Sequence, residues 1–224
     1  MQVAEKIEHS RIEESEIVTP KGHYELYKRV FDVCFALLLL PLLLPVMLII
    51  AILVKLDSKG PVFFSHKRIG KNGDSFHCYK FRTMIQNADK LLKEVLKDED
   101  AHEEWKKDFK LREDPRITKI GKFLRKSSLD ELPQLFNVLM GNMSFVGPRP
   151  IVDAEIKKYG RDFAYYTSVK PGITGLWQVS GRNDMDYNER IALDKEYTSL
   201  KSVKEDLKII LKTIPVVFMK RGAY

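Results

Sequence analysis

The sequence predicts an α-rich α+β protein: a re-entrant membrane helix-break-helix hairpin followed by a compact cytoplasmic domain with a short β-hairpin and interfacial amphipathic helices. Three observations lead to this class. Residues 33–54 contain no charged residue, residues 60–84 alternate aromatic and polar side chains, and later segments place apolar residues at helical spacing. The 224 residues suffice for one domain plus an anchor. We expect a mobile N-terminal segment (1–22), the membrane hairpin (23–58) and the folded domain (59–224).

The composition favours a polyanionic partner. The formal net charge is +7, which suits nucleic acid, an anionic bilayer or a phosphorylated substrate. The chain has no zinc-type cysteine spacing and no aromatic-rich basic repeat, whereas it does have a long apolar run, so we expect membrane lipids and no nucleic acid. Cys34 and Cys78 are predicted to be free thiols in a reducing compartment.

The apolar run is just long enough to cross a hydrocarbon core of about 30 Å at 1.5 Å per residue. Basic residues flank it on both sides, with Lys28 and Arg29 before it and Lys55 after it. The positive-inside tendency therefore places both ends in the cytoplasm. Pro41 and Pro45 each remove a helical hydrogen bond in mid-run. These features favour a helix that enters, breaks and returns, and an ordinary spanning signal-anchor remains the alternative.

The next segment, residues 60–84, is predicted to form a β-hairpin around Gly70 and Gly73. Positive charge is concentrated here, close to where the chain leaves the membrane. These side chains could contact lipid headgroups or a substrate. They are Lys67, Arg68, Lys80 and Arg82.

Three further helices are expected. Residues 85–109 show one amphipathic pattern, and we interpret the acidic run 98–104 within it as a solvated face or turn, not a metal cluster. Residues 151–169 are also predicted to be helical. In residues 202–220 a stripe of lysines borders an apolar stripe, which fits a helix in a membrane interface and equally a helix packed on the domain.

The central stretch, residues 127–150, carries the candidate reaction centre. Pro133 has no N–H and is best tolerated in a first helical turn, so a helix should begin near Asp130 and end at Gly141. Asp130 and Glu131 then lie at the positive end of a helix dipole, a place suited to phosphate binding. The alternative is ordinary capping by acidic residues.

An arginine between two prolines follows this helix. Gly147-Pro148-Arg149-Pro150 holds Arg149 on a stiff, extended backbone. A planar guanidinium is suited to bidentate contact with phosphate oxygens. Arg149 could also be a surface arginine in a stiff loop, but beside two carboxylates it favours a phosphate-handling site.

Several segments resemble the bacterial sugar transferases, the monotopic phosphoglycosyl transferases. The stretch DELPQLFNVLMGNMSFVGPRP resembles their signature, and GPVFFSHKRIGKNGDSFHCYKFRTM, DPRITKIGKFLRKSSLDELPQ and PGITGLWQVSGRN extend the resemblance over residues 24–224. The chain is most similar to the catalytic part of undecaprenyl-phosphate galactose or glucose phosphotransferases. Pro45 matches a helix-breaking proline of the family, whereas Leu44 replaces the usual serine before it. The sharpness of the break would then rest on Pro41 and Pro45.

The resemblance implies transfer of a hexose-1-phosphate from a UDP-sugar to undecaprenyl phosphate, with release of UMP. It implies that residues 59–224 are the catalytic domain and that Asp130 is the nucleophile of a covalent aspartyl-phosphosugar intermediate. Glu131 would assist proton handling or metal placement, and Mg²⁺ would be held by Asp130 and Glu131. The substrate contacts that we expect are Arg149, Arg125, Lys80, Arg82, Arg182 and Asp194.

The same resemblance implies a location and a pathway class. Nucleotide sugars are cytoplasmic and a lipid phosphate stays at headgroup level, so the catalytic domain should face the cytoplasm on the bacterial inner membrane. The product would start a lipid-linked surface glycan, such as exopolysaccharide, capsule or lipopolysaccharide O-antigen. The sequence leaves the sugar and the oligomeric state open, and a homodimer is compatible with it. A nucleotide-sugar hydrolase and a non-catalytic membrane-anchored binding protein are the alternative functions.

Overall fold

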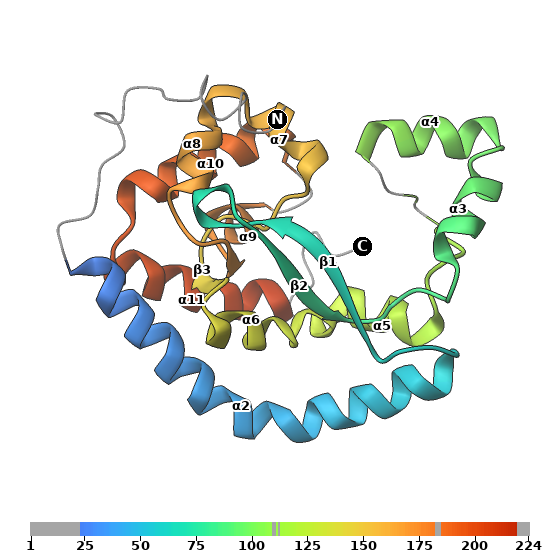
Figure 1. The fold of residues 1–224 in the computed structure, drawn as a ribbon, viewed down its shortest axis with the longest axis horizontal. Helices are drawn as coiled ribbons and strands as arrows, with labels where there is room; N and C mark the ends of the chain where they lie inside the picture. Colours follow the sequence, from blue (N-terminus) through green and yellow to red (C-terminus); the bar gives the residue numbers. More distant parts are fainter. Residues whose placement is uncertain (1–22, 109–110, 112, 182–184, 219–224) are drawn as a thin grey trace.

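A long helix, α2 (Tyr24–Asp57), runs along one side of the molecule (Figure 1). The computed structural model describes residues 23–108, 111, 113–181 and 185–218, so the predicted mobile segment 1–22 lies outside the described residues. The expectation of two helices separated by a break was wrong. Helix α2 is continuous and contains both Pro41 and Pro45, because a helix can absorb the lost hydrogen bonds by bending. Figure 1 shows it as a curved helix that follows the edge of the domain.

The predicted β-hairpin is present. Strands β1 (Phe63–Ile69) and β2 (Ser75–Phe81) pair antiparallel, with Phe63 opposite Phe81. Asn72 and Gly73 both have positive φ in the connecting turn, which explains the glycine there.

The segment after the hairpin folds as two helices and not as the single helix expected. These are α3 (Ala88–Val95) and α4 (Glu99–Asp108). The second begins anew because the Asp98 carboxylate accepts a hydrogen bond from the amide of Ala101, which is typical N-cap chemistry. Helix α5 (Lys119–Ser127) follows, capped by Thr118.

The central stretch forms the short 3₁₀ helix η2 (Leu129–Glu131) and then α6 (Gln134–Met140). Gly141 ends α6 with φ 86°, as the sequence predicts. Two very short strands, β3 (Ser144–Val146) and β4 (Gly172–Thr174), pair in parallel, which no sequence pattern indicates.

Residues 151–169 are largely helical, as predicted, but the helix is divided into four short pieces. They are η3 (Asp153–Glu155), α7 (Ile156–Tyr159), η4 (Gly160–Asp162) and α8 (Phe163–Thr167). Gly160, with φ 50°, follows α7 and is the first residue of η4. The chain continues into α9 (Leu176–Ser180), α10 (Tyr187–Leu200) and α11 (Val203–Phe218).

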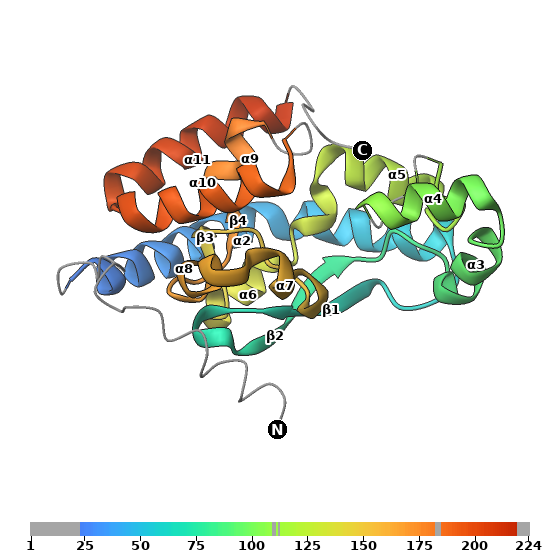
Figure 2. The same ribbon diagram turned by 90° about the horizontal axis from the view of Figure 1, so that it is seen from above.

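The domain has its helices and its hairpin on opposite sides. Seen from above, α9, α10 and α11 lie on one side and the β1–β2 hairpin on the other, with α6, β3 and β4 between them (Figure 2). One apolar core joins α2, β2, α6, β3 and α11 through Ala36, Cys78, Val138, Phe145 and Ile209. A second core joins the C-terminal half of α2 to β2 and α5. Both halves of α2 are therefore packed on the same domain.

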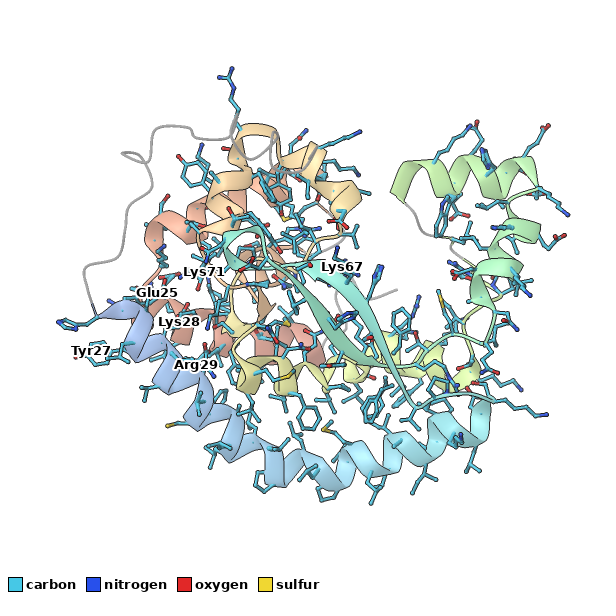
Figure 3. The ribbon with its side chains drawn as sticks, in the orientation of Figure 1. Glu25, Tyr27, Lys28, Arg29, Lys67 and Lys71 are labelled. Carbon is cyan, nitrogen blue, oxygen red and sulfur yellow. The ribbon has the colours of Figure 1, made fainter. Side chains whose placement is uncertain are left out.

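Polar contacts also fasten both ends of α2. At its N-terminal end Lys28 Nζ lies 2.7 Å from Asp206 of α11, and Arg29 donates to the carbonyls of Val138 and Leu139 (Figure 3). At the other end Asp57 accepts a hydrogen bond from the amide of Ile120 at 3.0 Å.

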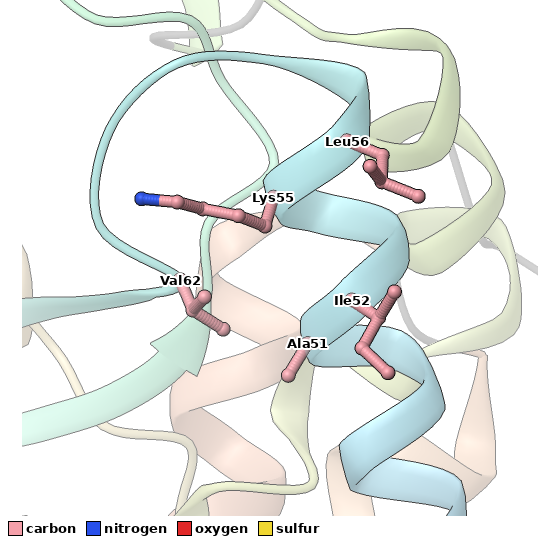
Figure 4. A pocket seen from close by; sticks show the side chains of 5 residues that line it. All are labelled: Ala51, Ile52, Lys55, Leu56 and Val62. Carbon is pink, nitrogen blue, oxygen red and sulfur yellow. The ribbon is translucent and has the colours of Figure 1, made fainter.

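The outer face of α2 is apolar and exposed. Within the described residues α2 is the one helix that is long and apolar enough to cross a membrane. Leu38, Leu42 and Leu56 are each at least 70% exposed, and Leu211 of α11 is 65% exposed. Near the end of α2, a shallow hollow of about 370 Å³ is lined by Ala51, Ile52, Lys55, Leu56 and Val62 (Figure 4). Such a surface is unusual for a chain surrounded only by water.

Candidate active site

Two adjacent carboxylates lie at the junction of α5 and α6. Ser128 ends α5 in the left-handed region with φ 57°, a conformation that non-glycine residues seldom adopt. This sharp turn places Asp130 and Glu131 in η2, directly before Pro133 and α6. Asp130 is buried and Glu131 is half-buried. The helix therefore begins a few residues later than expected.

Lys80 of β2 connects the hairpin to this pair. Its Nζ atom lies 2.6 Å from Glu131 Oε1 and 3.8 Å from Asp130 Oδ2. One ammonium group thus reduces the repulsion between two neighbouring carboxylates. The structure thus brings Lys80 to a carboxylate pair that lies about fifty positions later in the sequence.

Burial raises the pKa of Asp130 to about 6, and the negative charge of Glu131 adds to the increase. The positive charges of Lys80, Arg125 and Arg149 act in the opposite direction. Asp130 is therefore largely ionised at neutral pH, yet it is poorly solvated. A carboxylate in that state can act as a nucleophile.

Arg149 and Arg125 complete the positive surroundings. Arg149 Nη1 lies 3.9 Å from Glu131 Oε1, and its side chain keeps an exposure of 39%, which leaves it able to contact a ligand. Arg125 Nε donates to Thr83 Oγ1 at 2.9 Å, and burial lowers the pKa of Arg125. Both charges are close enough to lower the pKa of Asp130.

Arg82 lies in the framework of the site, away from the carboxylate pair. Its guanidinium donates to the carbonyls of Ser58 at 2.6 Å, Lys59 at 2.9 Å and Val54 at 3.2 Å, so it caps the end of α2. Substrate contact by Arg82 stays a prediction.

Asp194 is also a framework residue in the structure. It is buried, accepts a 2.6 Å hydrogen bond from the Tyr159 hydroxyl and lies 3.9 Å from Arg190 Nε. Burial raises its pKa to about 6. The expected metal or nucleotide contact of Asp194 stays a prediction, and Arg182 lies outside the described residues.

A small cavity beside the carboxylates includes residues that the sequence reasoning did not assign to the site. Among its lining residues are Gln134 and Gln178, together with Arg68, Lys80, Glu131 and Arg149. Burial lowers the pKa of Arg68, and the positive charge of Arg149 lowers it further, so two guanidinium groups lie near one another here. Gln178 belongs to the quoted segment PGITGLWQVSGRN, but a neutral amide has no pattern that marks it as functional.

The carboxylate pair fits a divalent ion that is shared with a phosphorylated ligand. The described residues contain no group of three or more His, Cys, Asp or Glu side chains that could hold a metal ion alone. Mg²⁺ commonly takes one or two carboxylates and completes its shell with phosphate oxygens and water. Asp130 and Glu131 offer that number, although Lys80 already contacts one Glu131 oxygen.

Comparison with known proteins gives a consistent result. The sequence profile of the family described as bacterial sugar transferase matches residues 23–220. The undecaprenyl-phosphate galactose phosphotransferase of Salmonella typhimurium is 50% identical over 88% of this chain and 41% of that protein. The exopolysaccharide production protein ExoY of Rhizobium meliloti is 49% identical over 95% of this chain and 93% of its own length.

The name of a third relative contains another sugar. The UDP-glucose:undecaprenyl-phosphate glucose-1-phosphate transferase of Escherichia coli is 40% identical over 96% of this chain and 47% of that protein. The chain thus spans less than half of these two longer relatives and nearly all of ExoY.

Proposed function

Because the chain belongs to the bacterial sugar transferase family, we propose that it transfers a hexose-1-phosphate from a UDP-sugar to undecaprenyl phosphate and releases UMP. The observation that carries this proposal is Asp130, a buried carboxylate with a pKa near 6 that is surrounded by Lys80, Arg125 and Arg149. This arrangement suits a carboxylate that attacks the phosphorus of a negatively charged phosphoryl group.

The reaction would have two steps. A carboxylate oxygen of Asp130 attacks the phosphorus next to the sugar, and the phosphorus–oxygen bond to UMP breaks, with its electron pair leaving on UMP. The resulting acyl phosphate is then attacked by a phosphate oxygen of the lipid, which frees Asp130 and forms the diphosphate. Each step exchanges one phosphorus–oxygen bond for another, so no oxidant or external acid is consumed.

The cations around Asp130 would bind the phosphoryl oxygens. Arg149 is the most accessible of them, and each charged contact contributes about 1.5–3 kcal/mol. Glu131 holds Lys80 in place and would share a Mg²⁺ ion with Asp130. That ion, when bound, neutralises part of the charge on the diphosphate.

The fastening of α2 supports a monotopic arrangement on the cytoplasmic face. Lys28 at one end and Asp57 at the other both contact the same domain. If α2 crossed the bilayer as a straight span with the domain on one side, one of its two ends would lie on the opposite side and could not contact the domain. With α2 lying in one leaflet, the site would be at headgroup level, where a lipid phosphate can reach it.

The names of the relatives support the substrate class but not one sugar. One relative is named for galactose and another for UDP-glucose, and ExoY is named for exopolysaccharide production. We propose that the product starts a lipid-linked surface glycan and that the donor is a UDP-hexose.

The test is nucleotide release by detergent-solubilised protein with Mg²⁺ and a panel of UDP-sugars, with and without undecaprenyl phosphate. We expect UMP in continuous turnover only with the lipid, and a sub-stoichiometric burst without it. Release of UDP would refute the mechanism, continuous UMP without lipid would indicate a hydrolase, and no nucleotide would indicate a non-catalytic protein.

Asp130→Asn tests the nucleophile in the same assay. We expect turnover to fall at least about 1,000-fold, because the amide cannot form the acyl phosphate. Asp153→Asn, at an exposed position, is the matched control and should leave the rate unchanged. Near wild-type turnover of Asp130→Asn would remove Asp130 from this role.

A further inference from the structure

We propose that Arg190 of α10 is a positioning residue for Arg149: it fixes the loop that carries the phosphate-binding guanidinium. The inference rests on the proposed function for its consequence, since Arg149 matters only if it binds the substrate's phosphates. Its structural basis is a hydrogen bond from Arg190 Nη2 to the backbone carbonyl of Arg149, 3.2 Å long.

The loop around Arg149 is fastened on both sides by backbone hydrogen bonds. The amide of Gly147 donates to Thr174, and the carbonyl of Pro148 accepts from Gly172, both at 2.9 Å. Farther along, the carbonyl of Ile151 accepts from Ile69 at 3.0 Å.

Between these points the loop depends on side chains. Pro148 and Pro150 have no N–H, so the loop cannot donate at those positions. The two remaining carbonyls accept from arginines: that of Arg149 from Arg190, and that of Pro150 from Arg68 at 3.2 Å. Arg190 therefore acts at the residue whose side chain faces the cavity.

Arg190 is itself held in one geometry. It is 7% exposed, and its Nη1 lies 3.3 Å from Glu155 Oε1. Glu155 also accepts from the Tyr187 hydroxyl at 3.0 Å and from the amide of Val152 at 2.8 Å. Glu155 thus ties Arg190 to the far end of the same loop. A buried, paired guanidinium is a rigid support and is costly to displace.

A shared aromatic ring links the two arginines a second time. The guanidinium carbons of Arg190 and Arg149 lie 5.0 Å and 5.9 Å from the centroid of the Trp177 ring. Both distances are within the range of cation–π attraction. Arg190 orients the ring and the loop, and Arg149 rests against both, so Arg190 acts through Arg149 and not on the substrate.

A double-mutant cycle tests the proposal. The four proteins are the wild type, Arg149→Met, Arg190→Met and the double variant. We expect Arg190→Met to lower kcat/KM for the UDP-sugar about 10-fold in the wild-type background and less than about 2-fold beside Arg149→Met. The loss should be mainly a higher KM. Arg190→Lys keeps one donor for the carbonyl and should recover part of the activity.

Arg161→Met is the matched control, because Arg161 is exposed on the nearby η4 and should tolerate the change. An equal loss in both backgrounds would overturn the proposal. If Arg190→Met fails to fold, Glu155→Gln takes its place in the cycle, since it keeps the side-chain volume and removes the charge that orients Arg190. Equal losses in that cycle would overturn the proposal too.

The same four proteins are also compared by their affinity for UDP in the presence of Mg²⁺, measured by calorimetry. This measurement requires no transfer reaction. A wild type that binds UDP but releases no UMP from any UDP-sugar in the transfer assay would refute the proposed function and leave the cycle interpretable. We expect the same non-additivity in the UDP dissociation constants. Additive losses of affinity would show that Arg190 does not act through Arg149.

Discussion

At the scale of single residues, the balance of charge at Asp130 decides the chemistry. Burial raises the pKa of this carboxyl to about 6, while Lys80 lowers it. The carboxylate is the nucleophile in the proposed reaction, so the fraction of active protein follows its ionisation. Small changes in the surrounding charges should therefore appear in the pH dependence of turnover.

We predict that turnover rises with pH through an apparent pKa of about 6, because Asp130 must lose its proton before it attacks. Lys80→Met removes a charge that lowers the pKa of Asp130. The acidic limb of the pH profile, in which turnover rises with pH, should therefore move to higher pH. Lys80→Arg keeps the charge and should leave the limb near its wild-type position. The measurement is the pH profile of UMP release, and an unmoved limb in Lys80→Met would contradict the assignment.

The ionised carboxylate of Asp130 should also lower the free energy of unfolding. In the folded protein its pKa is near 6, above the ordinary value of 3.8, so at pH 7 the folded state bears a penalty for a buried charge. The folded state binds the proton more readily, and the penalty disappears as pH falls from above 6 to below 4. We predict that Asp130→Asn raises the free energy of unfolding by about 1–3 kcal/mol at pH 7.

Thermal melting at several pH values measures this effect. The advantage of Asp130→Asn over the wild type should shrink steadily between pH 7 and pH 4. Asp153→Asn, at an exposed carboxylate, should show no such trend. A gain in stability that does not change with pH would mean that the charge of Asp130 is not its cause.

Several site residues could be identified from the sequence because neighbouring residues in the chain mark them. Pro133 marks a helix start, and Arg149 is held between two prolines, so Asp130 and Arg149 stand out. The contact of Lys80 with Glu131 depends on how the hairpin packs, and no local pattern specifies that. Arg190 and Gln178 could not be found because a buried arginine on α10 and a neutral amide have ordinary helical surroundings in the sequence.

At the scale of elements, the approach of α5 to the end of β2 holds the site together. A Cβ atom on Gly121 would lie 2.1 Å from the carbonyl oxygen of Thr83. The amide of Thr118 donates to that same carbonyl at 3.0 Å. Thr83 also accepts from Arg125, so a glycine at position 121 allows the contact that orients this arginine.

We predict that Gly121→Ala destabilises the protein by about 1–3 kcal/mol, because the added methyl group separates α5 from the backbone of Thr83. Turnover should fall as well, since Arg125 loses its alignment with Asp130. Lys122→Ala, the exposed next residue of α5, is the control for substitution in this helix. Urea unfolding gives the free energies, and a Gly121→Ala protein as stable as the control would contradict the close approach.

Elements were predicted well where their signals are local and poorly where single residues divide a helix. The hairpin and the end of α6 follow from glycines in the sequence. The single helix expected over 85–109 is wrong because Asp98 caps a second helix. The segment 151–169 is largely helical as predicted, but its helix is divided into short pieces, with a change of direction at Gly160. The parallel pair β3–β4 forms between two short segments that are far apart in sequence, so only the assembled domain specifies it.

At the scale of the whole molecule, α2 is an apolar arc fastened to the domain at both ends. Its exposed face carries large side chains such as Leu38, Leu42 and Leu56. The sequence predicts that this segment contacts the membrane and places two prolines in it. It could not show that the prolines bend the helix without interrupting it, because that depends on the packing of both halves against the domain.

We predict that both ends of α2 face the cytoplasm. In a Cys34→Ser background, in which the remaining Cys78 is buried, Tyr27→Cys and Lys59→Cys place one added thiol each at exposed positions. Each should react with an impermeant maleimide in inside-out vesicles and not in spheroplasts. Leu42→Cys, in the middle of the apolar face, should react in neither preparation. Opposite accessibility of the two end positions would establish a spanning helix and refute the monotopic arrangement.

The contact between Lys28 and Asp206 has a consequence for biosynthesis. The two residues are 178 positions apart, and a ribosome that adds about 5–20 residues per second needs roughly 10–35 s to make the intervening chain. Throughout that time Lys28 lacks its ion-pair partner, although the apolar side chains of the nascent helix are already made. In the proposed membrane arrangement, the bilayer is therefore the first surface that α2 contacts, and the domain then folds against a helix that is already in the membrane.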